Sequence, residues 1–586
     1  MYTELKTYQI IIALLKEYGI KHCVLSAGSR NVPFVHSIEE DPYFTCYSVV
    51  DERSAGYFAL GLSQELNQPV VISCTSSTAT CNYWPPVTEA YYQDVPLVVL
   101  TSDRDPAMLG QWEDQMIDQV GMYDRHVRKS VNLPIIHDAD DWLYCQRLVN
   151  EALLELDHHG TGPVHINIPM KSYNNSFNVR DLPKATRIRR FDYQTDDNEW
   201  MSCSRKLKEA KRVLVIAGQG NAWGSVFESA FKQFTDSYNV AVAAEYMANI
   251  PREKTINPTL CMEYRYITEK KFSEFIPDIV ISFGGNMTAG LKDMLRKCAG
   301  SFEHWSIMQD GSVCDMYKSL TTIFECEPSY FFGRMAGYSD GCNNGVYLNE
   351  LKQYENSVVM PEFDYCNVAA IQKVTQRIPA GSILHLAVNN AIRIANFFKL
   401  QPDVKVYANI GTHGIDGPIS STLGQAAASN RQVFLIVGDL AFFYDMNALR
   451  LRHIGNNVHI LLINNQGGEE FYYNKMWKNE ASDLHTTARH HTKAEGWARE
   501  CGFRYLSAHN MAELDEAVDS YFAEEATPVL LEVFTEMKAD SQVLYDLYDL
   551  SRPRDVQSEA IRKSKELIKA TIGQEKAQKI AGIFKR

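Results

Sequence analysis

Residues 436–468 read IVGDLAFFYDMNALRLRHIGNNVHILLINNQGG, and this stretch decides the predicted fold. Its first apolar run ends at Gly438-Asp439, and its second ends at Asn464-Asn465, 26 residues after Asp439. A carboxylate and an amide oxygen at two strand ends form a hard-oxygen ligand set that suits Mg²⁺. A glycine at 438 lets the backbone approach a phosphate, and the residues after it can begin a helix whose N-terminus receives a diphosphate. Two ordinary strand ends followed by turn residues would be the plainer interpretation.

Similar apolar runs recur along the chain and alternate with longer amphipathic stretches, which is typical of parallel sheets crossed by helices. The runs are HCVLSAG (22–28), PVVISCTSS (69–77), VPLVVLTSD (95–103), RVLVIAGQG (212–220), DIVISFGGN (278–286) and KVYANIG (405–411). Polar, turn-rich breaks lie at 171–197 and 338–365. We therefore predict three α/β domains at 1–180, 190–345 and 360–550, followed by a basic helical tail at 552–586.

The amino-acid composition limits the classes of protein to which this chain can belong. The net charge of −14 makes binding of nucleic acid a poor expectation, since that activity needs a basic face. No apolar run approaches the roughly 18 residues of a membrane span, and the N-terminus lacks the pattern of a signal peptide. The 13 cysteines form no CxxC pair, which disfavours a disulfide framework or a structural zinc site. We expect a reduced, cytoplasmic protein whose histidine pairs, 158–159 and 490–491, are ordinary surface or core residues.

The spacing of Asp439 and Asn465 resembles the signature of thiamine diphosphate (ThDP) enzymes. That resemblance implies Mg²⁺ or Mn²⁺ held by Asp439, the Asn465 side chain and a backbone oxygen near Gly467, with Gly438 and Leu440 also at the cofactor. It further implies a glutamate facing the cofactor's aminopyrimidine ring, and Glu52 in VVDERSAGYFALGLSQ (49–64) is the candidate. Ile415 would buttress the bent cofactor. In this family the two domains meet across a subunit interface, so a homodimer or homotetramer is expected.

Longer motifs narrow the resemblance. They are LSAGSRNVPF (25–34), DERSAGYFALG (51–61), CTSSTATCNYWPPVTEAYYQDVPLVVLTSDRDP (74–106), QWEDQMIDQ (111–119), ANIGTHGIDGPISSTLG (408–424) and NNQGGEEF (464–471). Together they resemble the menaquinone-pathway synthases that form 2-succinyl-5-enolpyruvyl-6-hydroxy-3-cyclohexene-1-carboxylate (SEPHCHC). The resemblance implies decarboxylation of a 2-oxo acid, 2-oxoglutarate, and carboligation of the product to an acceptor, isochorismate.

The same resemblance assigns expected roles to the substrate-binding residues. Ser29, Arg30 and Arg104 would bind carboxylates of the acceptor, because a planar guanidinium gives bidentate contacts. Gln115 would hydrogen-bond the reacting oxygens as a catalytic residue. The other expected substrate-binding residues are Arg393, Lys292 and Phe471.

Several positions depart from the family pattern. Asn389 stands where a serine is usual, Ile410 where an arginine is usual, and Glu470 where an isoleucine is usual. Lys292 could replace one lost cation, and His413 could act as an acid, a base or a packing residue. These departures favour one alternative, a paralogue that uses a less anionic donor or acceptor. A non-catalytic ThDP-fold binding protein is a further alternative, and the presence of Glu52, Asp439 and Asn465 argues against it. AGQGNAWG (217–224) is weak evidence for a dinucleotide, and we expect the middle domain to bind none.

Overall fold

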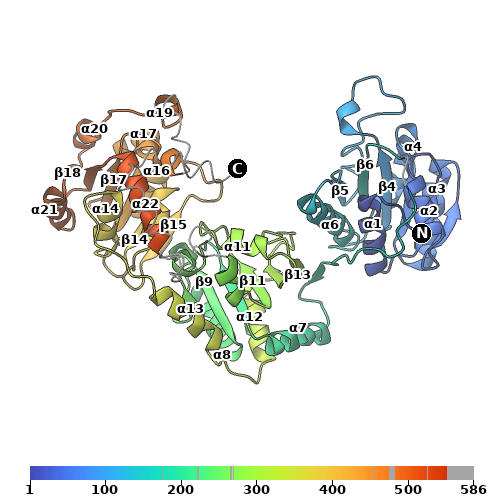
Figure 1. The fold of residues 1–586 in the computed structure, drawn as a ribbon, viewed down its shortest axis with the longest axis horizontal. Coiled ribbons are helices and arrows are strands. Elements are labelled where there is room, and N and C mark those ends of the chain that lie inside the picture. Colours follow the sequence, from blue (N-terminus) through green and yellow to red (C-terminus); the bar gives the residue numbers. More distant parts are fainter. Residues whose placement is uncertain are drawn as a thin grey trace, which may run out of the picture. The chain divides into compact units, whose positions relative to one another are not determined.

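The computed structural model describes residues 1–173, 176–220, 223–263, 267, 269–452, 454–473, 482–523 and 526–550. Figure 1 shows β-sheets flanked by helices, and the strands form sheets of six, seven and six strands. The predicted α/β class is confirmed. The predicted basic tail at 552–586 lies outside the described residues. None of the described helices combines the length and apolar character needed to cross a membrane.

The chain divides into two compact units, which are described separately. The first comprises Met1–Thr195 and His304–Cys326, and the second comprises Asp196–Glu303 and the described residues from Glu327 onward. The boundaries of the three predicted domains stay a prediction.

The first sheet lies in the first unit and has the strand order β2-β1-β3-β4-β6-β5, with every pair parallel. Its strands are β1 (His22–Leu25), β2 (Thr45–Ser48), β3 (Val70–Cys74), β4 (Leu97–Asp103), β5 (Lys129–Asn132) and β6 (Val164–Pro169). The helices along it are α1 (Lys6–Glu17), α2 (Val32–Glu39), α3 (Glu52–Leu66), α4 (Thr78–Asn82), α5 (Trp84–Tyr92) and α6 (Ala139–Leu154). Such connections place the loops that follow the strands at one edge of the sheet.

The second sheet has the order β10-β9-β8-β11-β12-β13-β7. Its strands are β7 (Arg189–Phe191), β8 (Val213–Ala217), β9 (Val240–Ala244), β10 (Thr255–Ile256), β11 (Ile279–Phe283), β12 (Glu303–Ile307) and β13 (Leu320–Phe324). The helices of this region are α7 (Asp197–Glu209), α8 (Gly224–Ser237), α9 (Pro258–Cys261), α10 (Glu269–Phe272), α11 (Leu291–Lys297), α12 (Pro328–Gly337) and α13 (Val346–Asn356). A Cβ at Gly218, in the glycine-rich motif, would lie 1.8 Å from the Gly285 oxygen, so close backbone packing explains this glycine.

The third sheet belongs to the second unit and has the order β15-β14-β16-β17-β19-β18, again all parallel. Its strands are β14 (Ile383–Leu386), β15 (Lys405–Ala408), β16 (Val433–Gly438), β17 (Val458–Asn464), β18 (Arg504–Ala508) and β19 (Val529–Phe534). The helices are α14 (Asn367–Thr375), α15 (Asn390–Ala395), α16 (Pro418–Ala427), α17 (Asp439–Asp445), α18 (Glu469–Tyr473), α19 (Ser482–His485), α20 (Glu495–Glu500), α21 (Met511–Tyr521) and α22 (Met537–Leu550).

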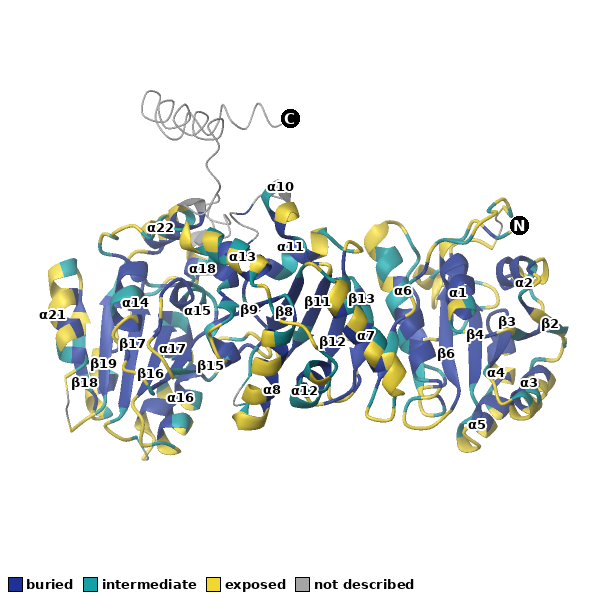
Figure 2. Cartoon of the chain, turned by 90° about the horizontal axis from the view of Figure 1, so that it is seen from below, coloured by how far each residue is buried: buried dark blue, intermediate teal, exposed yellow. Residues whose placement is uncertain are grey.

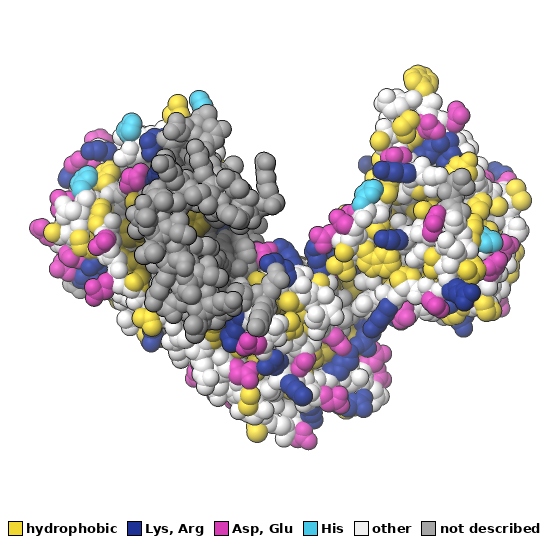
Figure 3. All heavy atoms as spheres, viewed as in Figure 1, with side chains coloured by type: hydrophobic (Ala, Val, Ile, Leu, Met, Phe, Trp, Pro, Cys, Tyr) yellow, Lys and Arg dark blue, Asp and Glu magenta, His cyan; other side chains and the backbone are white. Residues whose placement is uncertain are grey.

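The sheets form the cores. Strands such as β3, β4, β6, β8 and β17 are buried at every residue, and Figure 2 shows the strands dark blue between helices whose outer faces are exposed. Parallel strands covered on both faces need continuous apolar runs, which is why these segments were recognisable in the sequence. Acidic and basic side chains are interspersed over the face shown in Figure 3.

Buried histidines make the fold sensitive to acid. Burial lowers the pKa of His165 and His304 to about 3, and that of His385 and His459 to about 4. The unfolded chain therefore takes up protons below about pH 6.5 that the folded chain does not, so stability present above that pH is lost as the pH falls toward these pKa values. Each such group contributes a slope of about 1.4 kcal/mol per pH unit.

We predict that His165→Gln reduces the pH dependence of the unfolding free energy by the contribution of about one proton. Denaturant unfolding between pH 6.5 and 4.5 measures it. An unaltered slope in the His165 variant would contradict the assignment.

Candidate active site

The predicted site residues lie at the carboxyl ends of parallel strands. Asp439 directly follows β16, Asn465 directly follows β17, and Arg104 directly follows β4. Glu52 is the first residue of α3, the helix that follows β2. Ligand sites of open α/β sheets form at this edge. Glu52 and Arg104 belong to the first unit, and Asp439 and Asn465 belong to the second.

Asp439 is the buried first residue of α17, with 2% of its surface exposed. Its Oδ2 accepts a 2.9 Å hydrogen bond from the Gly467 backbone N–H, and its Oδ1 accepts one from Leu440 N at 2.6 Å. His490 Nε2 lies 3.3 Å from the same Oδ2. Gly467 has φ +152°, and a Cβ there would lie 2.7 Å from the Thr487 oxygen, so glycine lets this loop lie against Asp439.

These residues fit the predicted metal and diphosphate. A carboxylate, an amide oxygen and a backbone oxygen are the hard donors that Mg²⁺ prefers, and the structure ties the loop of Gly467 directly to Asp439. At Gly438 a Cβ would meet no atom within 4 Å, so open space lies in front of the backbone where a phosphate is expected. Leu440, also predicted at the cofactor, is half-buried in the first turn of α17.

The side-chain amide of Asn465 donates hydrogen bonds to two buried acidic residues. Its Nδ2 donates to Glu469 Oε2 at 2.8 Å and to Asp540 Oδ2 at 3.5 Å. Burial raises the pKa of Asp540 to about 6, and burial beside Asp540 raises the pKa of Glu469 well above its usual value. Because both contacts use the amide nitrogen, they leave the Asn465 oxygen for a metal ion.

Three of the predicted polar residues share one cavity in the second unit. Lys292, Arg393 and His413 line a cavity of about 190 Å³, together with Thr288, Gly290, Asp293, Asn389 and Ile392. Lys292 Nζ donates to the Met287 oxygen at 3.1 Å. Burial, with the charges of Arg393 and Lys292 close by, lowers the pKa of His413. The structure thus places Lys292, the expected substitute cation, beside Arg393.

The positions that depart from the family pattern lie in different surroundings. Glu470 forms an ion pair with Arg393, so it neutralises part of the cavity's positive charge. Ile410 is fully buried, whereas Ile415 is 36% exposed. Asn389 has φ +64° and precedes α15, and Phe471 is half-buried in α18.

Glu52 begins α3 next to its cap. The Asp51 carboxylate accepts a 2.8 Å hydrogen bond from Ser54 N, which satisfies a free N–H of the first turn and fixes where the helix begins. Glu52 is half-buried, and its Oε2 accepts a long hydrogen bond of 3.5 Å from Asn82 Nδ2. Among the described residues, its carboxylate is therefore only weakly engaged.

Arg30, Arg104 and Gln115 come together in the first unit. Arg30 Nη1 donates to Gln115 Oε1 at 2.8 Å, and Arg104 pairs with Glu113. Burial, with Arg104 close by, lowers the pKa of Arg30. The two arginines line a cavity of about 250 Å³. Ser29 is exposed beside Arg30.

Sequence reasoning missed several residues of both regions. Lys171 and Tyr173 line the cavity with Arg30, and the Arg30 guanidinium lies 5.6 Å from the Tyr173 ring centroid. Lys171 shortly follows β6, so a search for polar residues after the predicted strands could have found it. His490, beside Asp439, lies in a distant loop without a local signal.

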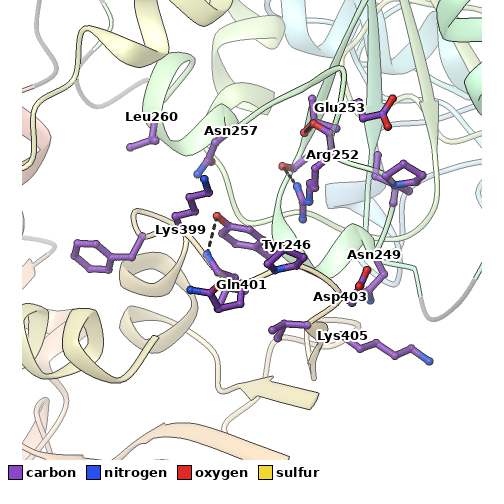
Figure 4. A pocket seen from close by; sticks show the side chains of 18 of the residues that line it. Tyr246, Asn249, Arg252, Glu253, Asn257, Leu260, Lys399, Gln401, Asp403 and Lys405 are labelled. Atoms are coloured by element: carbon purple, nitrogen blue, oxygen red, sulfur yellow. Dashed lines mark hydrogen bonds between the residues drawn. The ribbon is translucent and has the colours of Figure 1, made fainter. Parts of the chain in front are cut away.

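A larger cavity of about 1490 Å³ in the second unit contains none of the predicted site residues. Figure 4 shows its lining, which includes Arg252, Glu253, Lys399, Asp403 and Lys405. Arg252 donates to the backbone oxygens of residues 244 and 245 at 3.0 and 2.9 Å, so its guanidinium is used by the fold. Charges of both signs line this cavity.

Comparison with known proteins identifies the family. Residues 5–122 match the thiamine pyrophosphate enzyme N-terminal TPP binding domain, and residues 388–533 match the C-terminal TPP binding domain. A relative from Bacteroides thetaiotaomicron, named 2-succinyl-5-enolpyruvyl-6-hydroxy-3-cyclohexene-1-carboxylate synthase, is 39% identical over 557 residues, which cover 94% of this chain and 99% of the relative. Proteins of the same name from Phocaeicola vulgatus and Christiangramia forsetii are 38% and 32% identical, again over 94% of this chain and over 99% and 100% of theirs.

These matches confirm the predicted resemblance and the ThDP cofactor. The chain is a thiamine-diphosphate-dependent enzyme and belongs to the 2-succinyl-5-enolpyruvyl-6-hydroxy-3-cyclohexene-1-carboxylate synthase family.

Proposed function

We propose that this enzyme decarboxylates 2-oxoglutarate and joins the resulting four-carbon unit to isochorismate, which gives SEPHCHC. The relatives named for this product align with almost the whole chain. The observation that supports the proposal in the structure is that the predicted cationic side chains meet in two cavities, Lys292 and Arg393 in one and Arg30 and Arg104 in the other. Both proposed substrates carry two carboxylates, and guanidinium groups bind carboxylates in bidentate fashion.

The residues of the chain divide the work as follows. Asp439, the Asn465 side chain and the Gly467 backbone oxygen would hold Mg²⁺, and Glu52 would hold a proton at its carboxyl group against the aminopyrimidine ring. Thiamine diphosphate, when bound, supplies the electron sink for loss of CO₂ from the 2-oxo acid. Ile415 would pack against the cofactor. Arg393 and Lys292 would orient the donor's carboxylate. Ser29, Arg30, Arg104 and Gln115 would orient the acceptor, and Phe471 would contact substrate.

A second candidate has a specific observation in its favour. Glu470 pairs with Arg393 and so neutralises part of the positive charge at that cavity, and Ile410 stands where the family usually has an arginine. The same chemistry could then act on a less anionic 2-oxo acid. Competition between 2-oxoglutarate and pyruvate distinguishes the candidates. The first predicts a higher kcat/KM for 2-oxoglutarate, and the second predicts a higher kcat/KM for pyruvate.

We predict that Glu470→Gln raises kcat/KM for 2-oxoglutarate by about tenfold, because a carboxylate beside a bound carboxylate is repulsive. Steady-state kinetics with 2-oxoglutarate as the varied substrate measures the change. Glu495→Gln, which breaks a surface ion pair with Arg499, is the matched control and should leave kcat/KM unchanged. A fall in kcat/KM with 2-oxoglutarate would show that Glu470 supports donor binding instead.

We also propose that two copies of the chain form the working enzyme as a homodimer or a larger assembly. Large apolar side chains are exposed in the first unit near Glu52 and along the loop after β4, which stands out from the sheet in Figure 1. They include Val50, Phe58 and Val120, and Trp112 is 99% exposed. Exposed apolar groups of this kind mark interaction surfaces.

The assembly proposal predicts complementation between variants. Glu52→Gln and Asp439→Asn are expected to inactivate the enzyme when tested separately. Random mixing should restore about one quarter of the parent activity if each site takes Glu52 from one copy and Asp439 from the other. Activity of the unfractionated mixture tests this, and distinct affinity tags on the two variants measure how much heterodimer it contains. No recovery in a mixture shown to contain heterodimers would contradict a shared site.

A further inference from the structure

We propose that His158, His159 and Glu325 form a binding site for a divalent transition-metal ion, with Zn²⁺ the best fit. Both histidines lie in the connection between α6 and β6, and Glu325 directly follows β13, all within the first unit. Their ligand atoms lie within 4.8 Å of one another. Two imidazoles and a carboxylate are a known ligand set for zinc, which leaves the fourth position to water or another ligand. No residue of the ThDP site takes part.

The hydrogen-bond geometry leaves room for a positive charge between these groups. His158 Nε2 lies 2.9 Å from Glu325 Oε2, and His158 Nδ1 lies 2.9 Å from Glu155 Oε2. A neutral imidazole has one N–H and one lone pair, so it can donate to only one of two carboxylates. Either a second proton or a metal ion at Nε2 satisfies the other contact, while Nδ1–H donates to Glu155. His159 Nε2 faces the other oxygen of Glu325 at 2.7 Å.

The spacing needs only a small adjustment to accept zinc. With Zn–N and Zn–O bonds of about 2.0–2.1 Å, tetrahedral ligand atoms stand about 3.3 Å apart. The observed 2.7 and 2.9 Å contacts to Glu325 must therefore open by about half an ångström. The His159 side chain is 70% exposed and can move outward, whereas His158 and Glu325 are largely buried and fixed.

The surroundings support the ligands as in built metal sites. Glu155 accepts from His158 Nδ1, and Arg190 Nη2 donates to Glu155 at 2.8 Å. A carboxylate behind a ligand histidine fixes its tautomer and orientation. Arg190 also donates to the Gly311 oxygen at 3.1 Å. The carboxylates of Glu155 and Glu325 and the guanidinium of Arg190 sum to one net negative charge when both histidines are neutral. This negative charge favours a bound cation.

The backbone at His159 and at Gly311 has unusual conformations. His159 has φ +55°, a conformation that a non-glycine residue rarely adopts. Gly311 has φ +64°, and a Cβ there would lie 2.5 Å from Glu325 Oε2. The neighbouring core is a small cluster of Leu154, Ile188, Leu320 and Ile323 with partly buried neighbours. A bound metal would therefore cross-link the α6–β6 connection to the end of β13 where apolar packing is limited.

The test is zinc binding by the full-length enzyme. Protein stripped with a chelator is first saturated with Mg²⁺ and thiamine diphosphate, so that the Asp439 site is filled. Zn²⁺ is then titrated against a chromophoric chelator, and melting temperature is followed in parallel. Parent enzyme should bind one more zinc ion per chain than the Glu325→Gln or His158→Gln variant. Zinc should raise the melting temperature of the parent enzyme and not that of these two variants. His159→Gln, at an exposed side chain, covers the case in which a buried variant fails to fold.

Two further variants test a group that orients a ligand and control for adventitious binding. Glu155→Gln should keep the stoichiometry and bind zinc about 10–100-fold more weakly, as expected for a group that orients a ligand. His137→Gln, at an exposed histidine of the same unit, should behave as the parent and account for adventitious binding to histidines and cysteines. Equal zinc uptake by the parent, Glu325→Gln and His159→Gln would overturn the proposal and leave a proton-bridged ion cluster.

Discussion

Glu52→Gln is expected to lower turnover by about 10²–10⁴-fold, the range for loss of a positioned proton-transfer group. The amide keeps the size of the side chain but cannot exchange a proton with the aminopyrimidine ring. Binding of Mg²⁺ and the diphosphate should survive, because Asp439 and Asn465 are unchanged. Turnover is measured from CO₂ release, and cofactor affinity is measured by calorimetry on the same preparation.

Glu65→Gln provides the control for the Glu52 variant. Glu65 is an exposed glutamate on the same helix, α3, so this variant carries the same chemical change without touching the site. It should retain parent activity. Parent-like turnover by the Glu52 variant would remove this residue from the chemistry, and a loss of cofactor binding equal to the loss of turnover would make its role structural.

Asp439→Asn is expected to weaken the binding of Mg²⁺ and thiamine diphosphate by about 30-fold to several thousand-fold, the range for loss of a charged partner in a desolvated site. Asp439 is buried, so water replaces its charge poorly. Activity should recover partly at high Mg²⁺, because the other oxygen donors remain. The measurement is calorimetric titration of the apoenzyme with thiamine diphosphate at fixed Mg²⁺, followed by activity across a Mg²⁺ series.

Asp519→Asn is the matched control for the Asp439 variant. Asp519 pairs with Arg377 on the surface and is 76% exposed. Its loss should not alter cofactor affinity. Unchanged affinity in the Asp439 variant, with normal activity, would show that the metal is held elsewhere.

Much of the fold was readable because buried parallel strands carry continuous apolar runs. The runs at 22–28, 69–77, 95–103, 212–220, 278–286 and 405–411 all contain strands of the structure. Strands such as β12, with the sequence EHWSI, lacked this signal because polar residues interrupt them, and their burial depends on the sheet around them. Thr7–Leu15 of α1 are all buried, although polar residues such as Thr7 and Gln9 lie among them, because neighbouring elements cover the helix.

The metal-binding residues could be predicted from the strand ends, whereas the other site residues were predicted from the family resemblance. Asp439, Asn465 and Arg104 each lie at a strand end, where the fold class itself predicts ligands. The pairing of Arg393 with Glu470 and the approach of His490 to Asp439 join residues that are distant in the sequence. Likewise, the His158–His159 pair seemed ordinary because Glu325, which faces both rings, is 167 residues away from His158.

The proposed reaction is tested by supplying the enzyme with thiamine diphosphate, Mg²⁺ and 2-oxoglutarate, with and without isochorismate, while following CO₂ release and product mass. We expect an adduct with the mass of SEPHCHC that forms only when both substrates are present, with CO₂ released in equal amount. If the cofactor binds and neither substrate is consumed, the proposed reaction is wrong and the site serves another 2-oxo acid.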